Sequence, residues 1–101
     1  MTLANADAPG STTVHLRGDI DVTNAHEIGD ELTALVSAGN ETIVIVCSSI
    51  RFVESRGLAM MARVQRFADE SGCRLSWRAL PLHVLQSIHL TGLDQYLHIE
   101  A

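Results

Sequence analysis

The sequence contains no lysine, and all seven of its basic side chains other than histidine are arginines. The formal net charge of −5 and the scattered arginines argue against a surface that binds the phosphate backbone of nucleic acids. No apolar run approaches the roughly 20 residues that a membrane-spanning helix needs, and the first residues show no signal-peptide pattern. We therefore expect a cytoplasmic protein that neither binds nucleic acid directly nor inserts into a membrane.

Cysteine is also scarce, with only Cys47 and Cys73 present. Cys47 would end one predicted strand and Cys73 would begin the next, so in a parallel pair they would lie about 15 Å apart, too far for a disulfide. We predict two buried, reduced thiols and leave a redox role open. With 47% apolar and 19% charged residues, the 101-residue chain is typical of one globular domain.

Motifs for catalysis and cofactor binding are missing. The glycines are too scattered to form a phosphate-binding loop, and Ser55 lacks the Gly-x-Ser-x-Gly context of an exposed nucleophile. The five histidines show no metal-ligand spacing. We expect no enzymatic activity, no cofactor and no metal, although spacing alone leaves a Ser–His–acid triad open.

The most informative pattern lies between residues 42 and 61. Ile43–Val46 is a β-branched run without alternation, which predicts a strand covered on both faces of a sheet. Cys47–Ser49 is predicted to end that strand. Glu54-Ser55 then supplies an N-cap, in which the Ser55 hydroxyl would accept a hydrogen bond from a backbone N–H, and a helix follows over about Ser55–Glu70. A hydroxyl between a strand and a helix sits where open α/β sheets place their functional groups.

The N-terminal part predicts two further elements. Residues 1–11 form a loose arm or a short edge strand, and Thr12–Arg17 alternates as a half-exposed strand does. A helix begins near Asn24, which fits a capping box, with Thr23 as the competing cap. Gly39 is predicted to end that helix.

The C-terminal part continues the alternation of strands and helices. Cys73–Ala79 is predicted as a strand, and Pro81 opens a helix. The buried stripe of that helix is predicted to comprise Leu82, Leu85 and Ile88. Residues 97–99 are predicted to form a short last strand. Spacings of this kind predict βαβ crossovers and a mainly parallel sheet.

The helix predicted over Ser55–Glu70 is unusual because its apolar residues spread around more than half of its circumference. One interpretation is a helix wedged between the sheet and a neighbouring helix. The other is that Met60 and Phe67 contribute to a docking surface, because exposed apolar patches mark interfaces.

Four segments, in this order, resemble the landmarks of the STAS domain family, and specifically of its bacterial anti-sigma factor antagonists (anti-anti-sigma factors). They are Gly18–Asp21, Ile43–Val46, Phe52–Leu58 and Thr91–Leu93, and the resemblance runs from about residue 12 to residue 99. It implies a single STAS-like α/β domain over residues 12–101. Its mainly parallel, mixed sheet would have about four to five strands, with three to four helices.

The resemblance also implies a function. In that family the serine before the second helix is phosphorylated by the anti-sigma factor, which is a kinase. This chain would therefore bind a kinase-type anti-sigma factor and release a sigma factor for transcription, with Ser55 as the phosphoacceptor. The kinase would bring the ATP, and self-association stays open. The implied partner-binding residues are Asp19, Asp21, Thr23, Glu54, Arg56, Gly57 and Met60.

The chain departs from the family's usual Asp-Ser-Ser-Gly pattern at two positions. Glu54 is one methylene longer than the usual aspartate, and Arg56 replaces the second serine. Arg56 would either pair with a phosphate on Ser55 or block the kinase, which would leave a module that binds without being switched. One alternative is a non-phosphorylated STAS accessory subunit of a transporter or signalling complex. Another is a small-ligand-binding or redox-sensing module.

Overall fold

The computed structural model describes residues 2–100, which form one mixed sheet and its covering helices. The strands are β1 (Thr2–Ala8), β2 (Ser11–Ile20), β3 (Thr42–Val53) and β4 (Arg74–Arg78), and they lie in the order β1-β2-β3-β4. β1 is antiparallel to β2, whereas β2, β3 and β4 are parallel to one another. The α/β class and the mainly parallel sheet are therefore confirmed.

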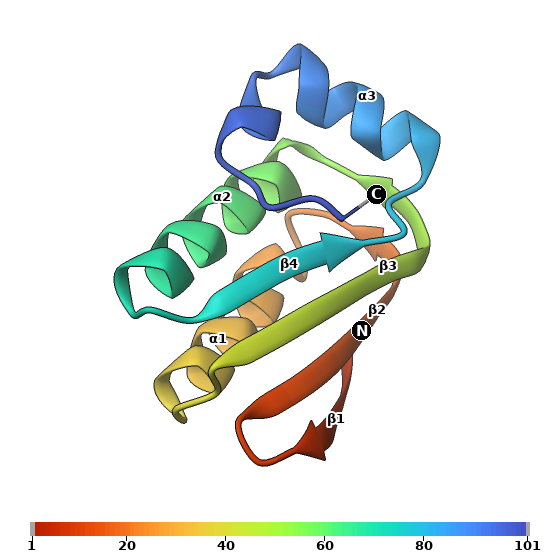
Figure 1. Ribbon diagram of the computed structural model, residues 1–101. Coiled ribbons are helices and arrows are strands. Elements are labelled where there is room, and N and C mark those ends of the chain that lie inside the picture. Colours follow the sequence, from red (N-terminus) through yellow and green to blue (C-terminus); the bar gives the residue numbers. More distant parts are fainter. Residues whose placement is uncertain (1, 101) are drawn as a thin grey trace.

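The helices are α1 (Ala25–Ser37), α2 (Ser55–Glu70) and α3 (Leu82–Leu90), followed by the short 3₁₀ helix η1 (Leu93–Gln95). Figure 1 shows α1 and α2 side by side on one face of the sheet, with α3 across the end where β3 leads into α2. The core lies between the sheet and this helical layer. Its largest fully buried apolar side chains are Trp77, Leu16, Ile20, Leu32, Ile43, Ile45, Met61, Leu75 and Ile88.

The N-terminal residues form an edge strand and not a loose arm. β1 pairs with β2 from the Thr2–Leu16 pair to the Ala8–Ser11 pair, with an irregularity between Ala6 and Ala8. Gly10 closes the hairpin with a φ of +79°, a backbone conformation that glycine adopts at little cost. Met1 lies outside the described residues.

β3 differs from the prediction in both its length and its burial. The strand continues through Cys47–Ser49 to Val53. Ile43 and Ile45 are buried, whereas Val44 and Val46 are only half-buried. The prediction that both faces are covered is therefore wrong, because α1 and α2 cover one face and leave the other partly open. An uninterrupted β-branched run fits a half-covered strand as well as a fully covered one.

The C-terminal elements also differ in detail. Leu82 is 71% exposed, and Val84 takes its place with Ile88 in the buried stripe of α3. The predicted stripe was wrong at Leu82 because that residue is the first of the helix and is left exposed to solvent. Residues 97–99 make a single parallel bridge, between Ile99 and Trp77, and not a strand.

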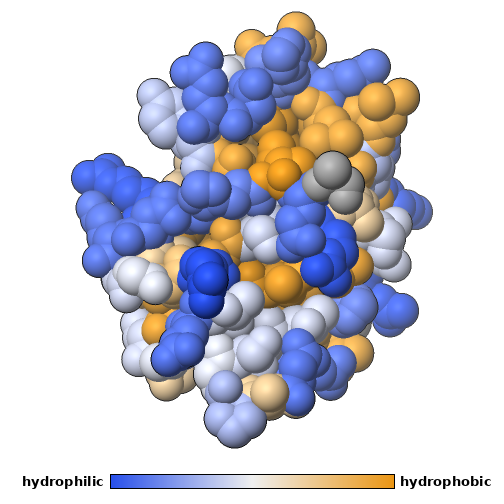
Figure 2. All heavy atoms as spheres, in the orientation of Figure 1, coloured by the Kyte–Doolittle hydropathy of each residue, from blue (hydrophilic) through white to orange (hydrophobic). Residues whose placement is uncertain are grey.

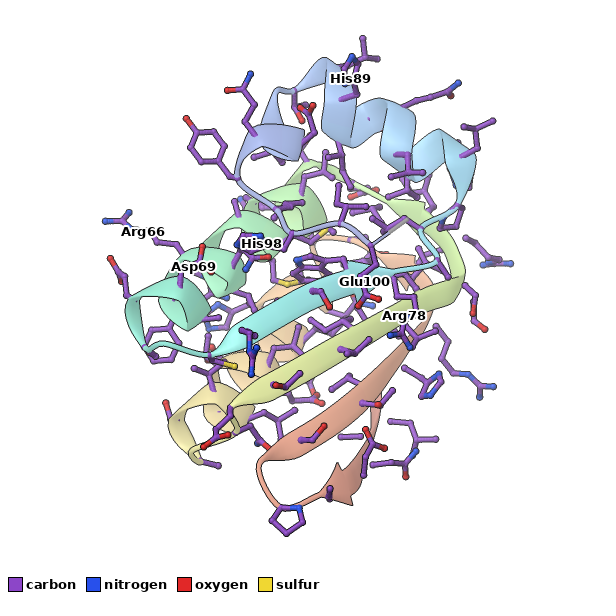
Figure 3. All side chains as sticks on the ribbon, in the orientation of Figure 1. Arg66, Asp69, Arg78, His89, His98 and Glu100 are labelled. Carbon is purple, nitrogen blue, oxygen red and sulfur yellow. The ribbon has the colours of Figure 1, made fainter. Side chains whose placement is uncertain are left out.

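A buried glutamine fastens this C-terminal segment to the core. The Trp77 indole N–H donates to Gln65 Oε1 at 2.9 Å, and the backbone N–H of His98 donates to the same oxygen at 3.1 Å. Gln65 Nε2 donates to the carbonyl oxygen of Leu75 at 3.1 Å. Figure 3 shows His98 beside Asp69 of α2 and Glu100 beside Arg78 of β4, and Arg78 Nη2 lies 3.0 Å from Glu100 Oε1. These contacts hold the last described residues against β4 and α2.

The cysteine prediction is confirmed, because Cys47 and Cys73 are both buried and free. Burial raises the pKa of the Cys47 thiol to about 12, so the reactive thiolate form is scarce at neutral pH. Within residues 2–100, no helix has the length and apolar character needed to cross a membrane. The same residues contain no cluster of three or more histidine, cysteine or acidic side chains placed to hold a metal ion.

Candidate functional site

Two loops meet where β2 and β3 end. The first, Asp21–Asn24, connects β2 to α1 and is called the turn below. The second segment, Glu54–Gly57, consists of the residue that links β3 to α2 and the first three residues of α2, and it is called the junction. The backbone N–H of Glu54 donates to the carbonyl oxygen of Ile20 at 2.9 Å, which ties the start of the junction to the end of β2.

Gly57 allows the junction to lie this close to β2. A Cβ atom added at this position would lie 2.6 Å from Val53 Cγ1 and 2.9 Å from Ile20 Cγ2. The carbonyl oxygen of Ile20 would be 3.2 Å away. Gly57 is buried, so the structure assigns it a packing role, whereas its predicted contact with a partner stays a prediction.

The turn is held by its own side chains. Asn24 Oδ1 accepts from the N–H of Asp21 at 2.9 Å, and Asn24 Nδ2 donates to the carbonyl oxygen of Asp19 at 2.8 Å. Asp21 Oδ1 accepts from both the N–H and the hydroxyl of Thr23. The predicted capping box is wrong, because Asn24 makes no side-chain bond to the first turn of α1 and instead closes the loop that precedes it.

These hydrogen bonds also lower the pKa of Asp21. The Thr23 hydroxyl and the Thr23 N–H hold the pKa of Asp21 below its ordinary value, with a smaller contribution from the N–H of Asn24. Asp21 therefore carries its negative charge at neutral pH, beside the junction.

The junction is free of such bonds. Glu54, in extended backbone with φ −82° and ψ 173°, is the N-cap residue of α2, and it makes no side-chain cap bond. The N-cap is Glu54, within the predicted Glu54-Ser55 pair, but the prediction that the Ser55 hydroxyl caps the helix is wrong, because Ser55 is already the first helical residue and α2 has no side-chain cap bond. Among residues 2–100, no group is hydrogen-bonded to that hydroxyl, and Ser55 is exposed.

Among the described residues, backbone N–H groups of the junction and the Arg56 side chain also lack partners. The first backbone bond of α2 runs from the N–H of Leu58 to the carbonyl oxygen of Glu54 at 3.0 Å. The preceding N–H groups, of residues 55–57, therefore have no partner in the helix. Arg56 is exposed and has no ion-pair partner within the described part of the chain.

The other predicted partner-binding residues divide into two groups. Thr23 and Glu54 are exposed, and Asp21 is half-buried, so these lie on the surface around Ser55. Asp19 is instead engaged on the neighbouring strand, where Arg51 Nη2 lies 3.1 Å from its Oδ2. Met60 is only 3% exposed, so its side chain packs in the core. At Met60 the structure favours the interpretation of α2 as a wedged helix.

Sequence reasoning missed the exposed apolar side chains around the junction. Val22 is 61% exposed, Phe52 is 50% exposed and Leu90 is 86% exposed. Val22 and Arg56 line one hollow of about 310 Å³ on the α1 side of the junction. Phe52 and Leu90 line another, of about 480 Å³, on the α3 side. Periodicity gave no signal for these residues, because their exposure depends on how the helices pack.

Comparison with known proteins gives both a family and structural relatives. The family model described as "Mlab, STAS domain" matches residues 3–99. A crystal structure of an anti-sigma factor antagonist from Mycobacterium paratuberculosis is 27% identical, with a TM-score of 0.84 over 98% of this chain and 83% of that one.

More distant structures share the fold alone. The anti-sigma factor antagonist SpoIIAA in its unphosphorylated form is 15% identical, with a TM-score of 0.81 over 100% of this chain and 89% of that one. The murine anion transporter Slc26a9 is 16% identical, with a TM-score of 0.76 over 89% of this chain and 16% of the transporter. Because the family match spans nearly the whole sequence, the chain belongs to the STAS domain family.

Proposed function

We propose that this protein is an anti-sigma factor antagonist of the cytoplasm, which binds a kinase-type anti-sigma factor through the turn and the junction and so frees a sigma factor for transcription. The observation that carries the proposal is the exposed, unbonded Ser55 at the start of α2. The 27% identical anti-sigma factor antagonist supports the class of partner. The protein would act through binding and not through catalysis.

Phosphorylation of Ser55 would reverse this binding. A phosphate adds about −1.5 to −2 charges, and the free N–H groups of the first turn of α2 would stabilise it on the unbound protein. In a complex, the same charge would lie beside Glu54 and Asp21 and would have to be desolvated, so the complex would dissociate. Arg56 would pair with the phosphate and hold it in place. SpoIIAA, whose fold is the same, also has a structure in its phosphorylated form.

A second candidate is a STAS module that serves a transporter and is never phosphorylated. The structural match to Slc26a9, which covers 89% of this chain and 16% of the transporter, favours it. The partner would then be a transporter component, and Ser55 would act as a contact and not as a switch.

The test combines complex formation with intact mass. The purified protein is incubated with a candidate anti-sigma factor kinase, ATP and Mg²⁺, in parallel with Ser55→Ala and Arg56→Ser. Ser71→Ala is the matched control, because Ser71 is the exposed C-cap residue at the opposite end of α2. The proposal predicts binding, together with a phosphate-sized mass gain that Ser55→Ala loses and Ser71→Ala keeps.

The other outcomes separate the alternatives. Binding without a mass gain, with phosphorylation restored in Arg56→Ser, would identify a constitutive antagonist in which Arg56 blocks the kinase. Failure to bind every kinase-type anti-sigma factor, with binding to a transporter component, would replace the proposal by the second candidate.

A further inference from the structure

A groove separates the start of α2 from the last turn of α3. It has a volume of about 480 Å³, and its lining includes Phe52, Ser55, Arg56, Ser87, Leu90 and Thr91. It is called the α2–α3 groove below. The groove therefore opens directly beside the hydroxyl that the proposed function makes the centre of the interface.

The α3 wall of the groove offers little to a polar ligand. Thr91 Oγ1 donates to the carbonyl oxygen of Ser87 at 2.9 Å. Ser87 Oγ donates in turn to the carbonyl oxygen of His83 at 3.2 Å. Both hydroxyl protons are thus used within α3. Leu90, at 86% exposed, projects from the same wall into solvent.

The opposite wall is apolar at Phe52, Val53 and Leu58, and it carries two charged side chains of opposite sign, Glu54 and Arg56. Phe52 is 50% exposed and stands on β3 just before the junction. Arg56 is exposed at the rim and has no ion-pair partner among residues 2–100. An apolar group in the groove would cover Phe52 and Leu90, while a carboxylate beside it would meet Arg56.

Exposed apolar surface is otherwise concentrated around the same helix. Figure 2 shows hydrophobic surface gathered around α3 and between α3 and the C-terminal segment, bordered by hydrophilic side chains. Large apolar side chains left in water near a binding surface mark the position of a partner. The α2–α3 groove is the hollow beside α3 whose lining includes Ser55.

We infer that the α2–α3 groove is the second half of the interface and that it takes a leucine-, isoleucine- or phenylalanine-sized side chain of the anti-sigma factor, flanked by a carboxylate that pairs with Arg56. This inference rests on the proposed function and adds the chemistry of the partner. It also gives phosphorylation a second effect, because a phosphate on Ser55 would place a charge at the mouth of an apolar site.

The test measures the affinity of an anti-sigma factor kinase, without ATP, for wild type, Phe52→Ser and Leu90→Ser. Leu82→Ser is the matched control, because Leu82 is 71% exposed at the other end of α3 and does not line the groove. We expect Phe52→Ser and Leu90→Ser to weaken binding by about tenfold or more, as loss of a central apolar contact does. Leu82→Ser should bind like wild type, and Leu90→Met should recover most of the affinity.

Circular dichroism and thermal unfolding confirm that each variant is folded, which is expected because the substituted side chains are exposed. Wild-type affinity in Phe52→Ser and Leu90→Ser would refute the inference that the groove is part of the interface. If Ser55→Glu still weakens binding in that case, the proposed function stands without the groove. If the wild-type protein binds no kinase-type anti-sigma factor, both are overturned.

Discussion

The turn and the junction lie side by side at the ends of parallel strands, yet they differ in how their polar groups are used. In the turn, Asn24 and Asp21 bond to the backbone around them, and Thr23 donates to Asp21. In the junction, the side chains of Ser55 and Arg56 have no bonded partner among residues 2–100.

This difference suggests separate roles for the turn and the junction, one structural and one available for binding. Polar groups that are already bonded add stability and gain little from a partner. Polar groups left free on a rigid element are available to a partner at little cost in ordering. The turn therefore acts as a fixed support, whereas the junction leaves polar groups available to a partner.

The largest expected loss of stability comes from a substitution that forces the turn and the junction apart. Gly57→Val adds a branched side chain where a Cβ alone would lie 2.6 Å from Val53 Cγ1. We expect a loss of about 3 kcal/mol or more in the free energy of unfolding, because overpacking displaces both β2 and α2. Urea unfolding measures it. Ala59→Val is the control, since Ala59 is an exposed residue of the same helix. Equal stability of the two variants would show that the loops are not in tight contact.

A smaller loss of stability is expected when a hydrogen-bonding side chain of the turn is removed. Asn24→Ala removes the bonds to the Asp21 N–H and the Asp19 carbonyl oxygen. The expected loss of unfolding free energy is about 1–2 kcal/mol. The same substitution at Asn5, an exposed asparagine of β1, provides the reference. A loss at Asn24 no greater than at Asn5 would mean that the turn is not held by its side chains.

Acid should weaken the turn in a defined direction. The Thr23 hydroxyl and N–H lower the pKa of Asp21 in the folded protein. The stability from this carboxylate is therefore present above the unfolded pKa of about 4 and is lost as the pH falls through the lower, folded value. Asp21→Asn should lose stability at pH 7 and converge with wild type as the pH falls. The effect is modest because the half-buried Asp21 still contacts solvent, and a pH-independent difference between the two proteins would refute it.

The smallest effect is expected at Ser55. If the hydroxyl capped α2, Ser55→Ala would cost about 1 kcal/mol. Because the hydroxyl has no hydrogen-bond partner among residues 2–100, we expect a change within about 0.5 kcal/mol. Thermal unfolding of Ser55→Ala and Ser71→Ala measures it. A loss near 1 kcal/mol for Ser55→Ala alone would restore the capping role.

The sequence predicted the order of elements and the position of Ser55 between a strand and a helix, because strands, helices and turn residues leave local signals. Glycines such as Gly39 ended their helices as expected, with a φ of +92° at that residue. The hydrogen bonds of side chains were harder to predict from the sequence. Whether Ser55 or Glu54 is the N-cap depends on the backbone angles of one residue. The partners of the Asn24 side chain depend on which backbone groups the fold of the turn brings close to it.

Exposure was the least predictable property. The run Ile43–Val46 does not show which face of β3 the helices will cover, and the sequence did not separate exposed Phe52 from buried Val53. Leu82 and Leu90 are exposed because α3 crosses only the end of the sheet (Figure 1). These features arise from how distant segments pack, which local patterns do not encode.

The proposed interface is tested most directly by amide hydrogen exchange of the protein, alone and with the anti-sigma factor kinase that we propose as its partner. We expect new protection at the turn, over residues 52–58 and over residues 87–91, with little change along β1. Protection on β1 or on the open face of the sheet, with the junction unchanged, would contradict it.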